Sequence, residues 1–500
     1  MEDTHSLIEQ RRRNLEGLRA RGVDPFRNSF CPDAQCGTVR AELARWAAWN
    51  QSPEPKGDPV GLAEGTRVRL AGRITAHRDM GKSQFLDLRD VSGRIQLWIQ
   101  PKVLGEAAAE LFKLLDLADF IGVEGTLFIT RMGEPSVKVE SFTPLGKALR
   151  PPPGKWHGLE DTEIRYRQRY LDLIANDPVR EVFLKRSRIL KEIRAFFHDR
   201  GYVEVETPMM QAIPGGAAAQ PFKTFHNALG CEFYLRIALE LYLKRLLVGG
   251  VDKVFEIGRN FRNEGLSRRH NPEFTMLEAY EAYGDYATMM DLTEAIIVAA
   301  AAAAGTPARF EWMGHAIDLA APFRRAKYDD LLRDVTGCDP EDPASVAAAA
   351  TRHGIETAGR HPDVVKSDLF EATVEKTLSG PVFVLDYPAA VCPLTKRKAA
   401  APHVAERFEL YVAGMELANA YTELNDPDLQ EELFRTQLAG LPAEESMARM
   451  DTDFIKALRH GMPPAGGLGI GIDRLVMFLT AAASIRDVIL FPIHRPRADG

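Results

Sequence analysis

The chain has few cysteines for its length, with five among 500 residues. Sparse and odd-numbered cysteine use indicates a reducing compartment rather than a disulfide-stapled secreted domain. Cys31 and Cys36 are the one close pair in the sequence. Since no second pair of zinc-finger spacing accompanies them, we interpret them as structural rather than as metal ligands.

Long apolar runs are also missing. The longest, Ala295–Ala304, is rich in alanine and too short to span a membrane. No apolar segment follows the three arginines at 11–13, so we predict no secretory signal there. Residues 7–21 instead predict a short charged helix.

A surplus of positive charge is missing too. The formal net charge is −7, which does not by itself indicate a nucleic-acid binder. Phosphate binding depends on local patches, however, so the whole-chain charge excludes little. With 45% hydrophobic and 27% charged residues, a chain of this length predicts two or more ordinary globular domains.

The N-terminal third contains a run of short alternating segments. Strands are predicted at 67–76, 84–89, 94–100, 120–130 and 136–142, with a helix at 105–115 between the third and fourth. Three strands, a helix and two strands is the order of an OB-fold barrel. Such barrels bind unstacked bases with aromatic faces and polar edges.

The richest mixture of charged and aromatic residues lies in FRNEGLSRRHNPEFTMLEAY, Phe261 to Tyr280. The segments on both sides of its centre alternate, which predicts a long antiparallel hairpin. One face would offer a cation, a flat ring and carboxylates, and this suits a ligand with a phosphate, a base and an ammonium. A solvated edge hairpin explains the same alternation equally well.

A glycine-spaced strand runs into a helix near the end of the chain, in GGLGIGIDRLVMFLT from Gly466 to Thr480. Gly467, Gly469 and Gly471 are two residues apart, so one face of this strand carries no side chains. A planar ring can approach such a backbone closely, although tight protein packing explains glycines in a strand as well.

These segments resemble the signature motifs of class II aminoacyl-tRNA synthetases. FRNE with its return strand resembles motif 2 (about 254–283), GLGIGIDR resembles motif 3 (about 466–480), and the helix from 179 followed by GYVEVETPMM resembles motif 1 (about 179–210). Further runs are similar to the lysyl-tRNA synthetases of bacterial type: RYRQRYLDLI, IPGGAAAQPF, LYLKRLLVGG, RHNPEFTMLE and ELNDP. The resemblance extends from about residue 7 to about residue 497.

The resemblance implies an α+β chain, in which an N-terminal OB-fold β-barrel precedes a class II catalytic domain built on an antiparallel sheet with flanking helices. We expect a helical extension at 1–60, an anticodon-binding barrel at 61–148, a linker at 149–178 and the catalytic domain at 179–500, with an insertion at 306–380. Its activity would be that of a lysine–tRNA ligase. Such an enzyme forms lysyl-adenylate and pyrophosphate from lysine and ATP, with Mg²⁺, and then lysylates the terminal adenosine of tRNA(Lys). It would be a cytoplasmic homodimer without a membrane partner.

The family pattern also implies the site residues. The positions that match ATP ligands are Arg262, Glu264, His270, Asn271, Phe274, Glu409, Glu416 and Arg474, of which Arg262 and Arg474 are catalytic and Glu409 and Glu416 bind magnesium. The lysine site would comprise Gly216, Glu240, Glu278, Tyr280, Asn419, Tyr421 and Glu423. Arg78, Phe85, Gln96 and Glu134 match positions that read anticodon bases. Seven residues of straight strand would place Glu409 and Glu416 on opposite faces, so their pairing rests on the resemblance.

Physical chemistry supports the choice of substrate. Glu423 and Glu278, with the hydroxyl of Tyr280, form a suitable receptor for an ammonium on a four-carbon stem. An amino acid without that ammonium would leave carboxylates unpaired, which gives strong rejection. The related enzymes for aspartate and asparagine would need a cation or an amide partner where Glu423 stands.

Two different functions explain the same motifs less well. A relative that lysylates protein would lack the barrel, and a binding protein without catalysis would not need Arg262 or Arg474. The chain departs from the family pattern at Leu239, Ala418, Ala420, Tyr421 and Cys392, and the extra methyls beside the lysine site are expected to narrow the pocket.

Overall fold

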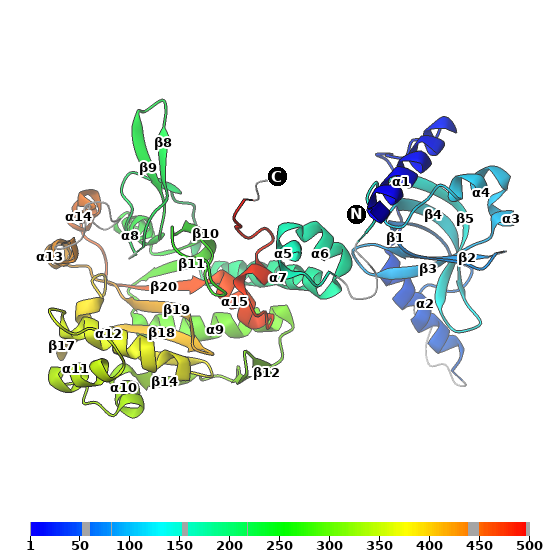
Figure 1. Ribbon diagram of the computed structural model, residues 1–500. Coiled ribbons are helices and arrows are strands. Elements are labelled where there is room, and N and C mark those ends of the chain that lie inside the picture. The colour runs from blue at the N-terminus through cyan, green and yellow to red at the C-terminus, as the bar shows by residue number, and fades with distance from the viewer. Residues whose placement is uncertain are drawn as a thin grey trace. The chain divides into compact units, whose positions relative to one another are not determined.

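The computed structural model describes residues 2–52, 61–81, 83–152, 159–217, 219–438 and 450–496. The chain divides into two compact units, Met1–Leu159 and Glu160–Gly500. Figure 1 shows the elements of each unit, which are described separately below.

The first unit is a closed five-stranded barrel with the strand order β1-β2-β3-β5-β4. Its strands are β1 (Arg67–Asp79), β2 (Gln84–Arg89), β3 (Arg94–Ile99), β4 (Phe120–Ile129) and β5 (Pro135–Gly146), with the short helices α3 (Pro101–Leu104) and α4 (Glu106–Phe112) between β3 and β4. Alternate residues of the strands point inward and fill the barrel with branched side chains. The predicted order of elements is therefore confirmed.

Two N-terminal helices, α1 (Glu2–Ala20) and α2 (Cys36–Asn50), belong to the same unit. Cys36, Val39 and Leu43 of α2 are part of the barrel core. Arg11 of α1 is buried and donates to the carbonyls of Leu117 and Ala148. The charged helix predicted at 7–21 is thus anchored by one of its arginines. The cysteines are free thiols, and burial raises the pKa of Cys36, as expected for a structural residue.

The second unit is built on an eight-stranded sheet with the order β14-β15-β18-β19-β20-β11-β10-β6. These strands are β14 (Arg324–Lys327), β15 (Val382–Leu385), β18 (Arg407–Val412), β19 (Met415–Thr422), β20 (Ala465–Gly471), β11 (Glu273–Ala282), β10 (Lys253–Phe261) and β6 (Val203–Glu204). Neighbours run antiparallel except at the two edges, β14 with β15 and β10 with β6. The α+β class with an antiparallel sheet is confirmed.

Helices and short strands surround this sheet. The main helices are α7 (Asp177–His198), α8 (Glu240–Val248), α9 (Tyr286–Ala304), α13 (Pro427–Leu438), α14 (Thr452–Leu458), α15 (Ile472–Leu479) and α16 (Ile485–Val488). Small sheets are formed by β7 (Met210–Gln211), β8 (Lys223–His226) and β9 (Cys231–Leu235), and by β16 (Arg397–Lys398) and β17 (Ala401–Ala405), with the 3-10 turn η2 (Ala389–Val391) nearby.

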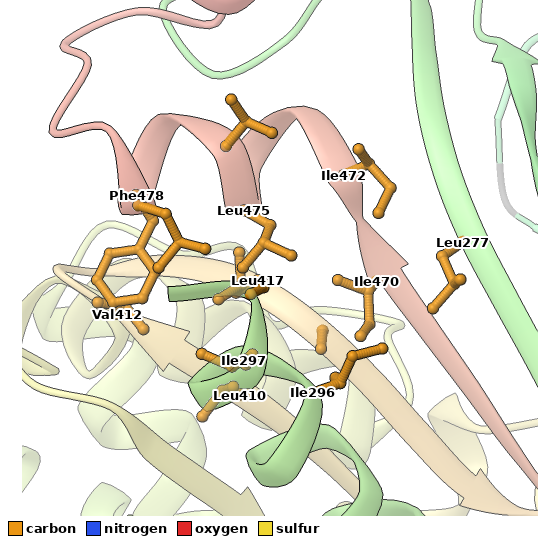
Figure 2. Packing of buried hydrophobic residues seen from close by; sticks show 14 of the residues in the cluster. Leu277, Ile296, Ile297, Leu410, Val412, Leu417, Ile470, Ile472, Leu475 and Phe478 are labelled. Carbon is orange, nitrogen blue, oxygen red and sulfur yellow. The ribbon is translucent and has the colours of Figure 1, made fainter. Parts of the chain in front are cut away.

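Strand alternation divides the central sheet into two unlike faces. On one face Leu277, Leu410, Leu417 and Ile470 pack against α9 and α15, which contribute Ile296, Ile297, Leu475 and Phe478 (Figure 2). The opposite face carries the polar residues of the hairpin and the glycines of β20. One face of the sheet is therefore buried against helices, and the candidate site is built on the other face.

α9 alters one expectation. The alanine-rich run, expected from the sequence to be too short to span a membrane, is only the second half of this helix. The whole helix has 19 residues and is long and apolar enough, by length and composition alone, to cross a membrane. Here Ile296, Ile297, Ala300 and Ala301 are buried in the main core of the unit.

The range 149–178, predicted as a linker, contains two helices, α5 (Thr162–Arg167) and α6 (Arg169–Ala175). The side chain of Asp161 caps α5 by accepting from two backbone amides. Arg169 is fully buried and donates to the carbonyls of Leu490 and Arg486. These contacts tie the second half of the range to the second unit.

The range 306–380, predicted as an insertion, forms a hairpin, three helices and one edge strand. The elements are β12 (Arg309–Trp312), β13 (His315–Asp318), β14, α10 (Tyr328–Thr336), α11 (Pro343–Arg352), α12 (Pro362–Thr373) and the 3-10 turn η1 (Glu375–Thr377). Tyr328 stacks on Phe370 with ring centroids 4.0 Å apart in a separate apolar cluster. Because β14 pairs with β15, the range extends the central sheet.

Candidate active site

The polar face of the sheet aligns residues from three strands. Across β11, β20 and β19, Glu278 pairs with Gly469 and then Asn419, and Tyr280 pairs with Gly467 and then Tyr421. The predicted hairpin is present as β10 and β11, with Phe274, Met276, Glu278 and Tyr280 on one face. The bare glycine strand thus lies between two strands that carry the candidate ligand-binding side chains.

A first cavity of about 350 Å³ opens on this face. Six of the seven predicted lysine-site residues line it: Gly216, Glu240, Glu278, Tyr280, Asn419 and Tyr421. Gly216 has a φ of 87°, and an added Cβ would lie 3.0 Å from the Cβ of Ala238 and 3.3 Å from that of Glu240. A side chain at 216 would therefore be strained as well as crowded.

Glu278 and Tyr280 form a buried pair in this cavity. The hydroxyl of Tyr280 donates to Glu278 Oε2 at 3.0 Å, and the backbone amide of Leu239 donates to Glu278 Oε1 at 3.1 Å. Burial, and then the charge of Glu240, raises the pKa of Glu278 to about 7. A cationic ligand would restore the ionised carboxylate.

Glu423, the seventh predicted residue, is placed differently from the others. It follows the end of β19, is almost completely buried and does not line the first cavity itself. Its Oε1 occupies the space that a Cβ at Gly467 would take. Cε1 of Tyr280 lies 2.7 Å from the same Cβ position. The missing side chain of Gly467 therefore makes room for a carboxylate directly against two residues that line the cavity, Gly467 and Tyr280.

Sequence reasoning missed Lys244, which forms an ion pair with this carboxylate. Its Nζ contacts Glu423 Oε2 and lies 2.6 Å from Glu240 Oε1. The sequence did contain one indication of this contact: Lys244 is four residues after Glu240, and this spacing places both side chains on one face of a helix.

A second cavity of about 160 Å³ adjoins the first and contains most of the predicted ATP ligands. Arg262, Glu264, His270, Asn271, Phe274, Glu416 and Arg474 all line it. Arg474 donates to the backbone carbonyl of Glu416 at 2.7 Å, and its Nη2 lies 3.1 Å from Nε2 of His270. Burial, and then the charge of Arg474, lowers the pKa of His270, so the imidazole is favoured as a neutral partner.

The helix that carries Arg474 is anchored by its neighbour. Asp473 is buried, accepts from the amide of Thr275 at 2.6 Å and pairs with Arg186 of α7 at 2.6 Å. An acidic residue in the first turn of α15 also complements the helix dipole. Arg474 is thereby held at a fixed position beside the glycine strand.

Arg262 lies where the two cavities meet. Arg262, Met276, Asn419 and Gly469 line both cavities. Within the described residues, Arg262 forms no ion pair and its buried Nε has no hydrogen-bond partner, while its guanidinium carbon lies 5.2 Å from the centroid of Phe274. An unpaired guanidinium at the junction is ready to bind an anion that reaches into both cavities.

Glu409 and Glu416 stand on the β18–β19 hairpin. Ala413 and Gly414 form its turn with φ of 49° and 64°, and the register shifts at Leu410/Tyr411 so that Glu409 pairs with Asn419 and Tyr411 with Glu416. This bulge adds one residue on β19 and brings both glutamates to one face, which straight strands would not do. Glu416 lines the second cavity; Glu409 lines neither and accepts from Tyr387 and Tyr411.

These two carboxylates suit a magnesium ion that is held mainly by a nucleotide. Among residues 2–52, 61–81, 83–152, 159–217, 219–438 and 450–496, no three His, Cys, Asp or Glu side chains gather as a metal-binding group. Magnesium commonly takes one or two carboxylates together with substrate phosphates. The donor set present is therefore adequate only with phosphate oxygens added.

The predicted base-reading residues of the barrel also lie close together. Arg78 donates to Gln96 Oε1 at 3.0 Å, and Gln96 donates to Ser136, which in turn donates to the carbonyl of Glu134. Phe85 pairs with Arg78 across β1 and β2, and it is half-buried rather than part of the barrel core. Glu134 sits in the turn before β5 and pairs with Arg40 at 3.2 Å.

Family models match both units. The model described as "tRNA synthetases class II (D, K and N)" covers residues 161–495, and one described as "OB-fold nucleic acid binding domain" covers residues 68–145. The chain belongs to the class II tRNA synthetases of the D, K and N group. This result agrees with a hairpin, a glycine strand and a flanking helix that together enclose two joined cavities.

Full-length relatives narrow the similarity further. A lysine–tRNA ligase from Pelotomaculum thermopropionicum is 49% identical over 99% of this chain and 96% of its own. Those from Xanthomonas oryzae pv. oryzae and Moorella thermoacetica are 48% and 47% identical, and the alignments cover 98% and 100% of those proteins.

Proposed function

We propose that this protein is an ATP-dependent lysine–tRNA ligase. It activates lysine as lysyl-adenylate, releases pyrophosphate and transfers the lysyl group to the terminal adenosine of tRNA(Lys). The observation that carries this proposal is a cavity lined by Glu240, Glu278 and Tyr280, with the buried carboxylate of Glu423 against its wall. This cavity joins the candidate nucleotide cavity at Arg262.

The first cavity binds lysine. Glu423 Oε1, Glu278 and the Tyr280 hydroxyl receive the ε-ammonium, while Glu240 and the backbone of Gly216 hold the α-ammonium. Within the described residues Glu423 Oε1 has no hydrogen-bond partner. A buried acceptor without a donor is costly, so a ligand ammonium there is strongly favoured over an uncharged chain end.

The carboxylate of lysine attacks the α-phosphate of ATP at the junction of the cavities. It is already ionised at neutral pH, so the step needs no general base. Arg262 binds both the attacking carboxylate and the α-phosphate, which places the two reactants and offsets the charge of the transition state. Phe274 stacks on the adenine with Arg474 opposite, and Glu264, His270 and Asn271 position the rest of the nucleotide.

Glu409 and Glu416 would hold Mg²⁺ together with phosphate oxygens of ATP, and the ion would supply neutralisation of negative phosphate charge. Arg474, whose Nη1 lies 3.3 Å from Glu416 Oε2, keeps this carboxylate beside the nucleotide.

Residues 61–148 bind the anticodon, with Phe85 stacking on a base and Arg78, Gln96 and Glu134 offering hydrogen bonds. Residues 179–500 form the catalytic domain, and the α7 region provides the interface of a homodimer. The enzyme works in the cytoplasm without a membrane partner.

The proposal is tested by ATP–pyrophosphate exchange with each proteinogenic amino acid in turn, followed by charging of total tRNA. We expect exchange with lysine and charging of the lysine acceptor alone. Exchange that depends on aspartate or asparagine, or exchange with no amino-acid dependence, would refute it.

A further inference from the structure

Lys244 places a lysine ammonium of the protein itself against the carboxylates of the pocket. Its Nζ lies 2.6 Å from Glu240 Oε1, pairs with Glu423 Oε2, and is 5.6 Å from the centroid of the Tyr421 ring. The side chain is fully buried and does not line the first cavity. This ammonium therefore stands behind the cavity wall and bridges α8 to the end of β19.

The ion pair with Lys244 gives the two carboxylate oxygens of Glu423 different surroundings. Oε2 faces Lys244, whereas Oε1 lies over Gly467 beside the ring of Tyr280, and both of those residues line the cavity. The ion pair favours the orientation of the carboxylate in which Oε2 stays beside the ammonium and Oε1 stays beside Gly467. Lys244 thus fixes the direction in which the free oxygen points.

The charges of the pocket make a second argument. Glu240, Glu278 and Glu423 are three buried carboxylates, and Lys244 is the one ammonium that forms ion pairs with them among the described residues. Two positive charges are therefore needed to balance the pocket, and lysine brings two ammonium groups while its carboxylate goes to Arg262. Without Lys244 a dication would leave one buried carboxylate uncompensated.

We propose that Lys244 is a positioning residue for the amino-acid substrate, whose resident ammonium orients Glu423 and matches the pocket's charge to an amino acid with two ammonium groups. This inference rests on the proposed function. It assigns a specificity role to a residue that touches neither lysine nor ATP.

The ionisation of the cluster supports this role. Burial acts to lower the pKa of Lys244, but the charges of Glu240 and Glu423 outweigh it and hold that pKa above its ordinary value. Burial raises the pKa of Glu423, and the ammonium of Lys244 opposes this shift. The groups that act on Glu423 and its neighbours are Glu240 and Lys244 on α8, Glu278 and Tyr280 on β11, Glu256 on β10, Arg407 on β18 and Tyr421 on β19.

The test compares Lys244→Met and Lys244→Arg with the wild-type chain in lysine-dependent pyrophosphate exchange across a pH series. We expect Lys244→Met to raise the lysine KM at least about tenfold while the ATP KM stays within about twofold. In the variant, Glu423 loses its adjacent cation and its pKa rises. The titration of Glu423, in place of that of Glu278, should therefore set the midpoint of the pH dependence of the lysine KM, about one unit or more higher than in the wild type. Lys244→Arg keeps the charge and should restore the midpoint.

Lys366→Met is a matched control. Lys366 pairs with Asp329 at 2.6 Å and lies 5.9 Å from the centroid of Tyr328, away from both cavities. We expect it to change the melting temperature without changing either KM. A Lys244→Met enzyme that loses stability but keeps the wild-type lysine KM and pH midpoint overturns the inference. If Lys244→Met does not fold, Lys244→Gln replaces it with the same criteria; wild-type protein without lysine-dependent exchange refutes the proposed function instead.

Discussion

Substituting the glycines of β20 one at a time tests the two-cavity arrangement most directly. Gly467 lines only the first cavity, Gly471 only the second, and Gly469 both. None of the three has a positive φ, so the backbone accepts alanine at each position. Differences among the variants must therefore come from what the added methyl group touches.

The structure ranks the three positions. A Cβ at 467 would overlap Glu423 Oε1 and lie 2.7 Å from Cε1 of Tyr280, whereas at 469 and 471 the nearest atoms are at 3.4 and 3.6 Å. Overpacking of this kind costs about 1–3 kcal/mol. If that cost falls on the bound lysine, Gly467→Ala raises the lysine KM by about 5- to 150-fold, since 1.4 kcal/mol is tenfold.

Exchange kinetics with lysine and ATP varied separately provide the assay. We expect Gly467→Ala to raise the lysine KM and leave the ATP KM within about twofold, and Gly471→Ala to do the reverse. Gly469→Ala should raise both. Thermal unfolding checks that each variant is folded. Equal effects at all three positions, or a wild-type lysine KM for Gly467→Ala, would show that the cavities are not assigned correctly.

Four further outcomes are expected. Arg262→Ala should abolish lysine-dependent exchange while the melting temperature stays near that of the wild type, because Arg262 is the one cationic residue among the described residues that line both cavities; wild-type exchange rates would refute the role. Glu423→Gln should raise the lysine KM by about 30-fold or more, the cost of breaking a buried charged contact, and the ATP KM much less. The lysine KM should fall as pH rises through about 7, because Glu278, whose pKa is raised to about 7, must lose its proton to receive an ammonium. Phe85→Ala should raise the tRNA KM in charging by about 5- to 150-fold, the loss of one stacked base, and leave exchange unchanged.

Two controls separate these effects from loss of fold. Arg309 pairs with Asp318 on the exposed hairpin of the range 306–380, so Arg309→Ala removes an arginine ion pair far from the cavity linings and should leave exchange unchanged. Phe120 is an exposed aromatic on β4 of the barrel, and Phe120→Ala should leave the tRNA KM unchanged. If Arg309→Ala lost exchange as Arg262→Ala does, or if Phe120→Ala raised the tRNA KM as Phe85→Ala does, the contacts assigned to Arg262 or to Phe85 would not explain the result.

Several parts of the fold follow from local sequence patterns. The period of two in Phe274, Met276, Glu278 and Tyr280 fixes which side chains share a face, whatever the strand pairs with. The same holds for the glycines of β20 and for the strands of the barrel, where turn residues mark the ends of each run. These features depend on neighbours in the chain, so the amino-acid sequence alone determined them.

Other features depend on contacts between distant segments, and only the tertiary structure decided them. The shared face of Glu409 and Glu416 comes from a bulge that strand pairing creates, and seven-residue spacing points the other way. The helices in 149–178 are held by residues more than 300 positions away, as Arg169 with Leu490 shows. Lys244 meets Glu423, the residue after β19, because α8 packs against β10 and β11 of the same sheet. Local periodicity determines which side chains share a face of a helix or strand. Long-range packing determines which of these faces contact each other, and the net charge of the pocket depends on those contacts.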